Sequence, residues 1–415
     1  MKQLLHTPEG GRDIYSIEYA KKLALQEQLH NVLHLYGYHD IQTPTFEFFD
    51  VFRKEIGTIP SRELYKFFDR EGNTLALRPD ITPSIARAAA TLFGDESLPI
   101  RLCYIGNTFI NHSSYRGKLK ESTQLGAELI GDASAEADAE MLALVIDCLK
   151  KSGLEEFQLT VGNVEFFHSI LEDAAMEEED ELRARELITN RNYFGLDEHL
   201  RDIKMKESTK KAFTLLPELI GGTEILSEAK KIAPSGDALK AIKHLEQIYH
   251  ILKQYGVEKY ITFDLSMSGI YGYYTGIIFR GYTYGTGDAV VKGGRYDCLI
   301  EKFGKESPAI GFAVVVDELM NALSRQKIQI PYGNKNTFIV YEEARKSDAI
   351  SLAINFRSKN KNTELMKKDY AKPLEEYIEY GKKNMACSML FLQDGGQLAM
   401  FNLVTGERKV INPET

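Results

Sequence analysis

Apolar residues recur at helical spacing in several stretches of the first part of the chain. From Ser16 to Tyr36 the spacing predicts a helix, and Gly37 follows at the position where a helix end favours a positive φ. Residues 136–151 show the same periodicity with a polar opposite face, which predicts a second, amphipathic helix. A shorter helix is predicted near Pro83–Ala90, directly after the segment RPDIT.

Strand-like patterns alternate with these helices. The segment HDIQTPTFEF predicts one short strand that carries Pro44 and ends in Glu47, and the proline indicates a sheet edge. Two further strands, Tyr65–Phe68 and Thr74–Leu77, are predicted to form a hairpin around a Glu-Gly turn. Strands are also predicted at Leu98–Ile105 and Phe157–Val161.

The stretch Phe109–Gly131 combines a polar, basic loop with an alternating apolar run. It predicts a separate pair of strands joined by a long loop, with Gln124 and Glu128 on one face because residues four apart on a strand point the same way. Inward polar side chains without partners cost about 1–3 kcal/mol each. We therefore expect a structural polar pair, a solvated face, or a small ligand with donors.

The second part of the chain changes character twice. Residues of about 166–256 are charged and helical in periodicity, which predicts an insertion of several helices. Strands rich in Gly, Tyr and β-branched residues then resume at Tyr260–Leu265 and continue through GYYTGIIFRGYTYG, VVKGGRYD and PAIGFAVVV. A closing helix begins at Asp317 and ends near Arg325.

A Pro- and Gly-containing linker, residues 326–335, precedes a β-α-β-α-β-β pattern. We predict two domains: residues 1–325, an α+β domain with an antiparallel sheet flanked by helices and with the helical insertion at about 166–256, and residues 334–415, a small α/β domain.

Composition narrows the class of protein. The chain has 415 residues and a net charge of −9, which gives no electrostatic reason to expect nucleic-acid binding. Its 4 cysteines form no CxxC pair, so we expect a reducing cytosol and neither a disulfide framework nor a zinc site. No signal-peptide pattern, membrane-spanning run, His-Glu metal spacing or P-loop motif is present, and a cytoplasmic protein without metal is expected.

Polar residues cluster between a predicted strand and helix. Arg78, Asp80 and Thr82 are consistent with an ordinary helix cap, in which a side-chain oxygen accepts a free N–H group, or with a carboxylate aimed at a ligand amine. The tyrosines of SGIYGYYTGIIF pack in a core or line a pocket, where a phenol can hydrogen-bond an imidazole or carboxylate; they are Tyr271, Tyr273 and Tyr274.

Two basic segments have weaker patterns. The turn Lys292–Tyr296 contains two glycines and could cradle a phosphate through backbone N–H groups, although glycine turns between strands are common. The loop residues Arg116, Lys118 and Lys120 are more typical of a solvated loop.

Taken in order, these motifs resemble class II aminoacyl-tRNA synthetases, and histidyl-tRNA synthetase most of all. The matching segments are PEGGRDI, GYHDIQTPTFE of the dimer-interface motif, LRPDIT, QLGAELIG, YYTGIIF, GGRYD and PAIGFA. The resemblance implies a class II fold, in which Asp80, Thr82, Gln124, Glu128, Tyr273 and Tyr274 contact a histidine. It also implies that residues 334–415 are a shortened anticodon-binding domain.

The nucleotide side of this site departs from the synthetase pattern. In register with the family, Ile110 replaces the arginine that grips ATP, His112 a glutamate, and Ser122 the phenylalanine that stacks on adenine. Glu318 replaces the arginine for the γ-phosphate, and residues 266–269 contain no basic residue where another arginine is expected. Adenylation develops negative charge that arginines stabilise, and the loss of one such donor costs about 3–4 kcal/mol.

An amino-acid pocket without an ATP site resembles the histidyl-tRNA-synthetase-like regulatory subunits of ATP phosphoribosyltransferase, whose LRPD-x-T segment matches Asp80. This resemblance implies a non-catalytic subunit that pairs with a short-form catalytic subunit in a hetero-oligomer and self-associates through the class II dimer interface. It would be required for activity and for feedback inhibition by histidine in the first step of histidine biosynthesis. The alternatives are a divergent active histidyl-tRNA synthetase and a free-standing histidine-sensing or RNA-binding paralogue.

Overall fold

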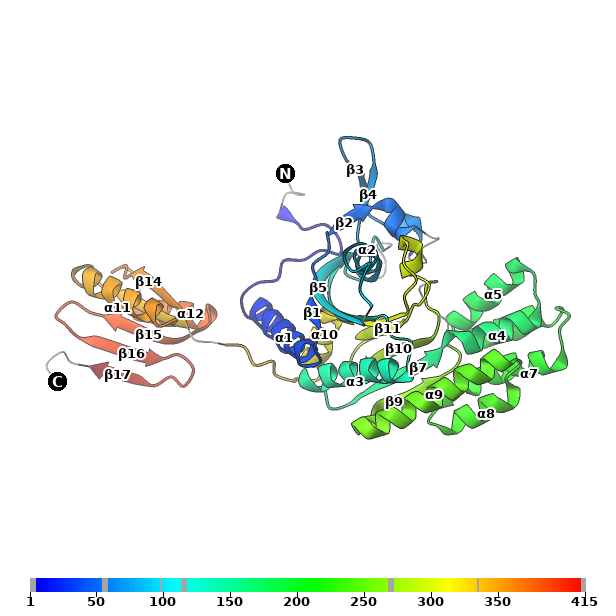
Figure 1. Cartoon of the computed structure of the whole chain (residues 1–415). Coiled ribbons are helices and arrows are strands. Elements are labelled where there is room, and N and C mark those ends of the chain that lie inside the picture. The colour runs from blue at the N-terminus through cyan, green and yellow to red at the C-terminus, as the bar shows by residue number, and fades with distance from the viewer. Residues whose placement is uncertain are drawn as a thin grey trace. The chain divides into compact units, whose positions relative to one another are not determined.

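The computed structural model is shown in Figure 1. It describes residues 5–53, 59–97, 99–112, 118–267, 272–333 and 336–411. The chain forms two compact units: residues 1–13 with 25–330, and residues 14–24 with 331–415. Within the described ranges, no helix combines the length and apolar character that crossing a bilayer requires.

Among the described residues, nine strands of the first unit form one mixed sheet. In pairing order they are β1 (His39–Asp40), β5 (Ile100–Phe109), β6 (Glu121–Ile130), β12 (Ala309–Val315), β11 (Val291–Arg295), β10 (Ile277–Thr283), β7 (Phe157–Asn163), β9 (Ile261–Asp264) and β8 (Ile220–Gly221). The central pairs from β5 to β7 are antiparallel, while β1 joins β5 and β9 joins β7 in parallel.

Helices flank this sheet and bury one apolar face each. Helix α1 (Ser16–Leu35) buries Leu25, Leu29 and Leu33, which recur every fourth residue and therefore share a face. Helix α3 (Ala135–Lys151) packs against β12 and begins at a Ser134 cap whose hydroxyl accepts a hydrogen bond from the Ala137 N–H. The other helices that position the site are α2 (Thr82–Leu92) and α10 (Val316–Arg325). These elements confirm the predicted α+β class.

Two strand predictions were wrong in their boundaries. The segment predicted as a single edge strand is divided between β1 of the large sheet and β2 (Phe46–Phe48), which pairs with β4 (Thr74–Leu77) and β3 (Lys66–Phe68) in a separate sheet. Pro44 lies between β1 and β2, where its carbonyl accepts a hydrogen bond from Arg78, and no ladder N–H is needed.

The stretch Phe109–Gly131 is not a separate hairpin. Phe109 ends the long strand β5, which began at Ile100, and β6 supplies the rest of the stretch. The two strands pair antiparallel along their full length, from Ile100 opposite Ile130 to Phe109 opposite Glu121. The loop between them lies partly outside the described residues.

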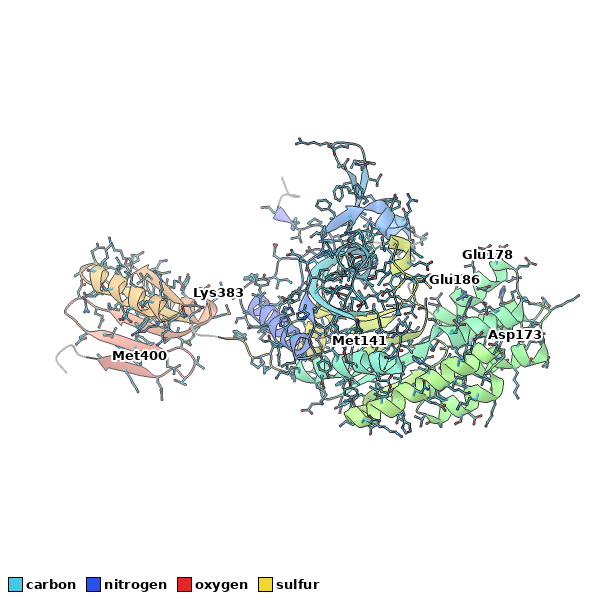
Figure 2. The ribbon with its side chains drawn as sticks, in the orientation of Figure 1. Met141, Asp173, Glu178, Glu186, Lys383 and Met400 are labelled. Carbon is cyan, nitrogen blue, oxygen red and sulfur yellow. The ribbon has the colours of Figure 1, made fainter. Side chains whose placement is uncertain are left out.

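The segment for which a helical insertion was expected, about 166–256, is mostly helical in the structure. Its helices are α4 (Val164–Ala174), α5 (Glu178–Thr189), α6 (Tyr193–Leu200), α7 (Glu207–Leu215), α8 (Glu224–Ile232) and α9 (Gly236–Tyr255). Figure 2 shows Glu178 and Glu186 on α5, where both are exposed, whereas Met141 of α3 is buried in the core. The two-residue strand β8 within this segment was not predicted, because it pairs with β9 and carries too short a pattern.

The second unit contains a five-stranded sheet among its described residues. In pairing order the strands are β14 (Thr363–Lys367), β13 (Asn336–Tyr341), β15 (Ala386–Leu392), β16 (Leu398–Asn402) and β17 (Arg408–Ile411), and the helices are α11 (Lys346–Ser358) and α12 (Leu374–Lys383). Phe338 packs with Tyr377 of α12, whereas the adjacent Ile339 packs with Ala349 of α11. The two helices therefore cover opposite faces, since neighbouring strand residues point to opposite sides. The edge strand β17 was missed from the sequence.

Candidate functional site

The residues predicted from the sequence to bind histidine lie together in the first unit. Five of them line one small cavity: Asp80, Thr82, Gln124, Tyr273 and Tyr274. Glu128 is fully buried and is joined to the cavity wall by its hydrogen bond with Thr82. The volume of this cavity is about 30 Å³, which is enough for roughly two water molecules. A larger ligand therefore requires lining side chains to move.

Three segments that are distant in sequence build this cavity. Asp80 and Thr82 lie where β4 gives way to α2, and Tyr273 and Tyr274 precede β10. Gln124 on β6 lies opposite Val315 of β12. Glu128 lies on the same face of β6 as Gln124, because the two residues are four positions apart on the strand.

Glu128 is the most buried acidic group of the site. Its Oε1 accepts a hydrogen bond from the Thr82 hydroxyl at 2.8 Å, and its Oε2 accepts one from the Tyr296 hydroxyl at 2.6 Å. Burial raises the pKa of Glu128 to about 8, and the nearby Asp80 carboxylate adds to the shift against these two hydrogen bonds. At neutral pH this carboxyl group is therefore mostly protonated.

Asp80 accepts a hydrogen bond at each of its two carboxylate oxygens. Its Oδ1 accepts from the N–H of Thr82, the first residue of α2, at 3.4 Å, which resembles a helix cap. Its Oδ2 accepts from the Tyr273 hydroxyl at 2.6 Å, within the cavity wall. Burial raises the pKa of Asp80 despite these hydrogen bonds. Two carboxyl groups in one buried site favour a ligand that brings positive charge or N–H donors.

Gln124 carries an unsatisfied acceptor. Its side-chain oxygen is buried and has no hydrogen-bond partner among the described residues. Such a group costs about 1–3 kcal/mol when it stays unpaired. Because Gln124 lines the cavity, a donor on a bound ligand would remove this penalty.

Glycines make room for the buried polar groups. A Cβ atom at Gly311 would overlap the Glu128 carboxylate, and one at Gly294 would lie 2.7 Å from the ring of Tyr274. Both glycines lie in central strands, β12 and β11, where they otherwise weaken the sheet. Their presence is explained by the close approach of these side chains.

The structure contradicts both the phosphate cradle and the glycine turn considered for Lys292–Tyr296. Residues up to Arg295 form β11, and their backbone groups are used in ladders with β10 and β12. The guanidinium of Arg295 is buried, where it donates to Asp138 at 2.5 Å and to Asp297 at 3.0 Å. Lys292 instead lines the cavity, as does Tyr296.

The sequence did not predict that Lys292 and Tyr296 line the cavity, because the face to which a residue of β11 points depends on how that strand pairs. Lys292 lies opposite Ala313 and Gly294 lies opposite Gly311, on the β12 face that continues to Glu128. The alternation Lys-x-Gly-x-Tyr within VKGGRY was the available signal. It indicates one shared face for Lys292, Gly294 and Tyr296 once the segment is read as a strand.

Arg78, the other arginine near the pocket motifs, is also structural. Its guanidinium is buried and donates to the carbonyl oxygens of Thr43 at 3.0 Å, Pro44 at 3.2 Å and Asn107 at 2.8 Å. These hydrogen bonds hold the segment that precedes β2 against strand β5. Neither Arg78 nor Arg295 is available to a ligand phosphate in this arrangement.

The positions that depart from the synthetase pattern surround the far end of β5 and β6. Ile110 continues the pairing by donating its N–H to the Lys120 carbonyl at 2.9 Å, and the Ser122 hydroxyl lies 3.1 Å from that of Thr108. Glu318 is half-buried in the first turn of α10, and His112 is half-buried after β5. Ile110 and Glu318, the two of these residues that replace an arginine of the synthetase pattern, supply no cation there.

Of the basic loop, Lys118 pairs with Asp288 at 3.0 Å, and the backbone of Lys120 donates to Gly10. Arg116 and Tyr271 lie outside the described residues. The Lys118 pair supports the interpretation of a solvated loop, since both partners are exposed.

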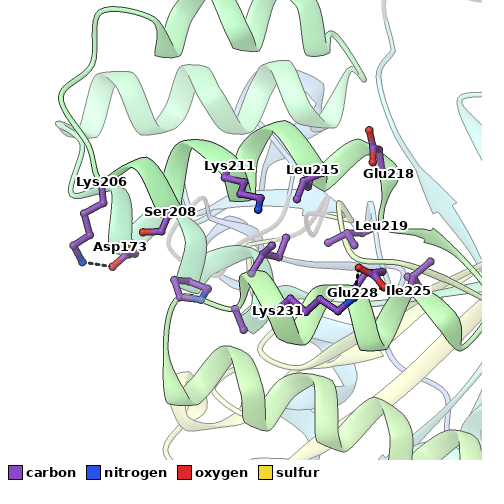
Figure 3. A pocket seen from close by; sticks show the side chains of 13 residues that line it. Asp173, Lys206, Ser208, Lys211, Leu215, Glu218, Leu219, Ile225, Glu228 and Lys231 are labelled. Carbon is purple, nitrogen blue, oxygen red and sulfur yellow. Dashed lines mark hydrogen bonds and ion pairs between the residues drawn. The ribbon is translucent and has the colours of Figure 1, made fainter.

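A larger cavity, about 430 Å³ by the same measure, lies in the helical insertion between α7 and α8 (Figure 3). Two of its lysines are paired with carboxylates, Lys206 with Asp173 at 2.6 Å and Lys231 with Glu228 at 2.7 Å. It contains none of the sequence-predicted site residues. Two carboxyl groups with raised pKa values, Asp80 and Glu128, lie at the small cavity instead, and groups with perturbed pKa values cluster at functional sites.

Known proteins share both the sequence and the fold. The family model of histidyl-tRNA synthetase matches residues 10–319. ATP phosphoribosyltransferase regulatory subunits of Acetivibrio thermocellus and Ruminiclostridium cellulolyticum are 40% and 35% identical. The matches cover 85% and 96% of this chain and 84% and 95% of the relatives.

Solved structures agree with this assignment. An ATP phosphoribosyltransferase regulatory subunit/histidyl-tRNA synthetase from Bacillus halodurans has a TM-score of 0.82 and 32% identity, over 94% of this chain and 98% of that one. Histidyl-tRNA synthetase from Nostoc has a TM-score of 0.80 at 18% identity, over 98% of this chain and 96% of that one, which shows the fold alone. The predicted class II synthetase-like fold is thus confirmed, and the chain belongs to the family of histidyl-tRNA-synthetase-like ATP phosphoribosyltransferase regulatory subunits.

Proposed function

We propose that this chain is a non-catalytic regulatory subunit that binds histidine in the cavity described above. The observation that carries the proposal is the convergence of Asp80, Gln124 and Glu128 on one buried site with an unsatisfied acceptor. Histidine is compact and supplies donors for these acceptors, namely an ammonium group and a ring N–H.

Each part of histidine has a candidate partner. The imidazole would face Glu128 and a tyrosine of 273–274, and the amino-acid backbone would contact Gln124, Thr82 and Asp80. Lys292, which lines the same cavity, is the candidate partner for the ligand carboxylate. The Thr82 and Tyr296 hydroxyls occupy the two oxygens of Glu128, so its contact with the imidazole requires a shift of the Thr82 or Tyr296 side chain.

The same site is unsuited to adenylate formation. Arginine clamps on the transferring phosphoryl group supply much of the rate in such chemistry, and each lost donor costs about 3–4 kcal/mol. Ile110 and Glu318 occupy two of the clamp positions, and both arginines near the pocket motifs are engaged in structural contacts. We expect the purified protein not to charge histidine tRNA, and measurable charging would favour the alternative of a divergent active synthetase.

The partner is a short-form ATP phosphoribosyltransferase catalytic subunit. In this proposal the subunit is required for the activity of the hetero-oligomer and confers feedback inhibition by histidine in the first step of histidine biosynthesis. Histidine must bind two assembly states with different affinity, as allosteric coupling demands. Self-association through the class II-type interface, a shortened anticodon-binding role for residues 334–415 and a cytoplasmic location are further parts of the proposal.

The second candidate function, a free-standing histidine sensor, shares the pocket and differs only in its partner. The relatives named ATP phosphoribosyltransferase regulatory subunits, which match over most of their length, favour the hetero-oligomer. Co-purification with a short-form catalytic subunit separates the two.

Isothermal titration calorimetry with L-histidine tests the pocket, on the subunit alone and in its complex. We expect saturable binding that Gln124→Ala weakens by about 5- to 150-fold, the equivalent of 1–3 kcal/mol for a lost buried hydrogen bond. Gln158→Ala is the matched control, because Gln158 is an exposed glutamine on β7 of the same sheet. The absence of histidine binding in both preparations would overturn the proposal.

A further inference from the structure

A cluster of metal-ligating side chains lies at the edge of the large sheet, away from the cavity. His30 and His34 come from α1, Asp40 from β1 and Cys103 from β5. Each offers one ligand atom, and the four atoms all lie within 4.8 Å of one another. The expectation of no metal site considered CxxC and His-Glu patterns only, and it overlooked the spacing His30-x-x-x-His34.

The fold brings these residues together for definite reasons. His30 and His34 are four apart on α1 and so share a face, with ring centroids 4.2 Å apart. Strand β1 pairs with β5 in parallel, in the register that sets Asp40 opposite Cys103. Because α1 is followed almost directly by β1, both histidines lie over this pair of residues.

The ligand atoms lie close enough together for one tetrahedral ion to bind after small side-chain shifts, which must separate His30 from Asp40. Bonds of about 2.0–2.3 Å to nitrogen, oxygen and sulfur imply ligand–ligand separations of roughly 3.3–3.7 Å in a tetrahedron. The Cys103 Sγ lies 3.5 Å from an Asp40 oxygen and 3.9 Å from His30 Nε2. His34 Nε2 lies 3.2 Å from the other Asp40 oxygen, and His30 contacts Asp40 directly.

The donor set selects the class of ion. Two imidazoles, one carboxylate and one thiolate are the nitrogen, oxygen and sulfur ligands of Zn²⁺, whereas Mg²⁺ and Ca²⁺ take oxygen ligands. Cys103 is fully buried, while Asp40 and His34 are 60% and 42% exposed in the single chain. The competing interpretation is an ordinary network in which Asp40 bonds to two histidines without metal.

We propose that His30, His34, Asp40 and Cys103 form a tetrahedral site for Zn²⁺ that fastens α1 to the β1–β5 edge of the sheet. The site joins three elements through one ion. It is independent of the histidine cavity, since it shares no residue with it.

Titration of the full-length, metal-free protein with Co²⁺ tests this site, because Co²⁺ reports its own ligands. We expect one ion per chain, the visible absorption of tetrahedral Co²⁺ and a near-ultraviolet thiolate-to-cobalt band, all removed by added Zn²⁺. Zn²⁺ should also raise the thermal midpoint of the wild-type protein by several degrees, and a chelator should reverse the rise.

Variants decide whether these four residues bind the ion. Cys103→Ser should abolish the thiolate band, and His34→Ala should weaken binding at least about tenfold, since even outer-shell partners contribute 10- to 100-fold. The exposed residues His39 and Cys298 supply matched controls, His39→Ala and Cys298→Ser, which should leave the spectrum unchanged.

His34 is on a helix surface, so His34→Ala keeps the test decisive if Cys103→Ser does not fold. An octahedral spectrum, a loss of signal in the controls, or wild-type affinity in His34→Ala would each overturn the proposal.

Discussion

Glu128 shows how a single residue links stability to pH. Its carboxyl group has a pKa of about 8 in the folded chain, because of burial, against about 4.3 in an unfolded one. Between these two pH values the folded state holds a proton that the unfolded state has released. The free energy of unfolding therefore falls as pH rises through this window, by up to a few kcal/mol.

Glu128→Gln should remove most of this slope, because a neutral amide does not titrate. Urea unfolding at pH 5, 6, 7 and 8 measures it: the wild-type protein should lose stability relative to the variant as pH rises. Glu121→Gln, at the exposed start of the same strand, is the matched control and should follow the wild-type profile. Parallel profiles for wild type and Glu128→Gln would contradict a protonated, buried Glu128.

Gly311 is the second residue for which the structure predicts a clear effect of substitution. In Gly311→Ala the new methyl group would overlap the Glu128 carboxylate, which must move. We expect a loss of about 1–3 kcal/mol, as in overpacked cores, together with a loss of histidine binding in calorimetry. Gly287→Ala is the control, because a Cβ atom there meets nothing within 4 Å. Unchanged histidine affinity in Gly311→Ala would separate Glu128 from the ligand site.

Residues that occur within recognisable motifs were predictable from the sequence. Gln124 and Glu128 could be predicted as inward-facing from alternation alone, and the resemblance supplied Asp80 and Tyr273. Their mutual hydrogen bonds could not be predicted, because the pairing of Tyr273 with Asp80 joins residues 193 positions apart.

At the scale of elements, a buried ion pair connects α3 with β11 near the site. Asp138 of α3 is fully buried and accepts from Arg295 of β11 at 2.5 Å and from His244 of α9 at 2.6 Å. This one carboxylate joins the sheet, the helix packed on it and the last helix of the insertion.

Asp138→Ala should destabilise the protein by about 3–5 kcal/mol, because it leaves Arg295 buried without its main partner. Glu136→Ala, on the exposed side of the same helix, should change stability by less than about 0.5 kcal/mol. Urea midpoints measure both. A cost below about 1 kcal/mol for Asp138→Ala would show that Asp297 alone can balance Arg295.

Long, strongly periodic elements were predicted best. The helices at Ser16–Leu35 and Ala135–Lys151 agree with the expectation to within about a residue. The two-residue strands β1 and β8 were not predictable, because pairing with distant strands defines them. Likewise the end of β5 at Phe109 depends on β6, which continues the ladder beyond the apolar pattern.

At the scale of the whole molecule, the first unit contains both the candidate ligand cavity and the proposed metal site. The family is shown by relatives that match over most of their length, while the use of the cavity for histidine remains our proposal. In our proposal the chain transmits the presence of a ligand and leaves the chemistry to its partner. Its function is therefore visible only in the presence of its partner.

The most direct measurement is phosphoribosyl transfer from phosphoribosyl pyrophosphate to ATP by a short-form catalytic subunit, with and without this chain. We predict that activity requires the chain, that histidine then inhibits it, and that Gln124→Ala preserves the activity while raising the inhibitory histidine concentration by at least about 5-fold. A catalytic subunit whose activity and response to histidine are the same with and without the chain would contradict the account.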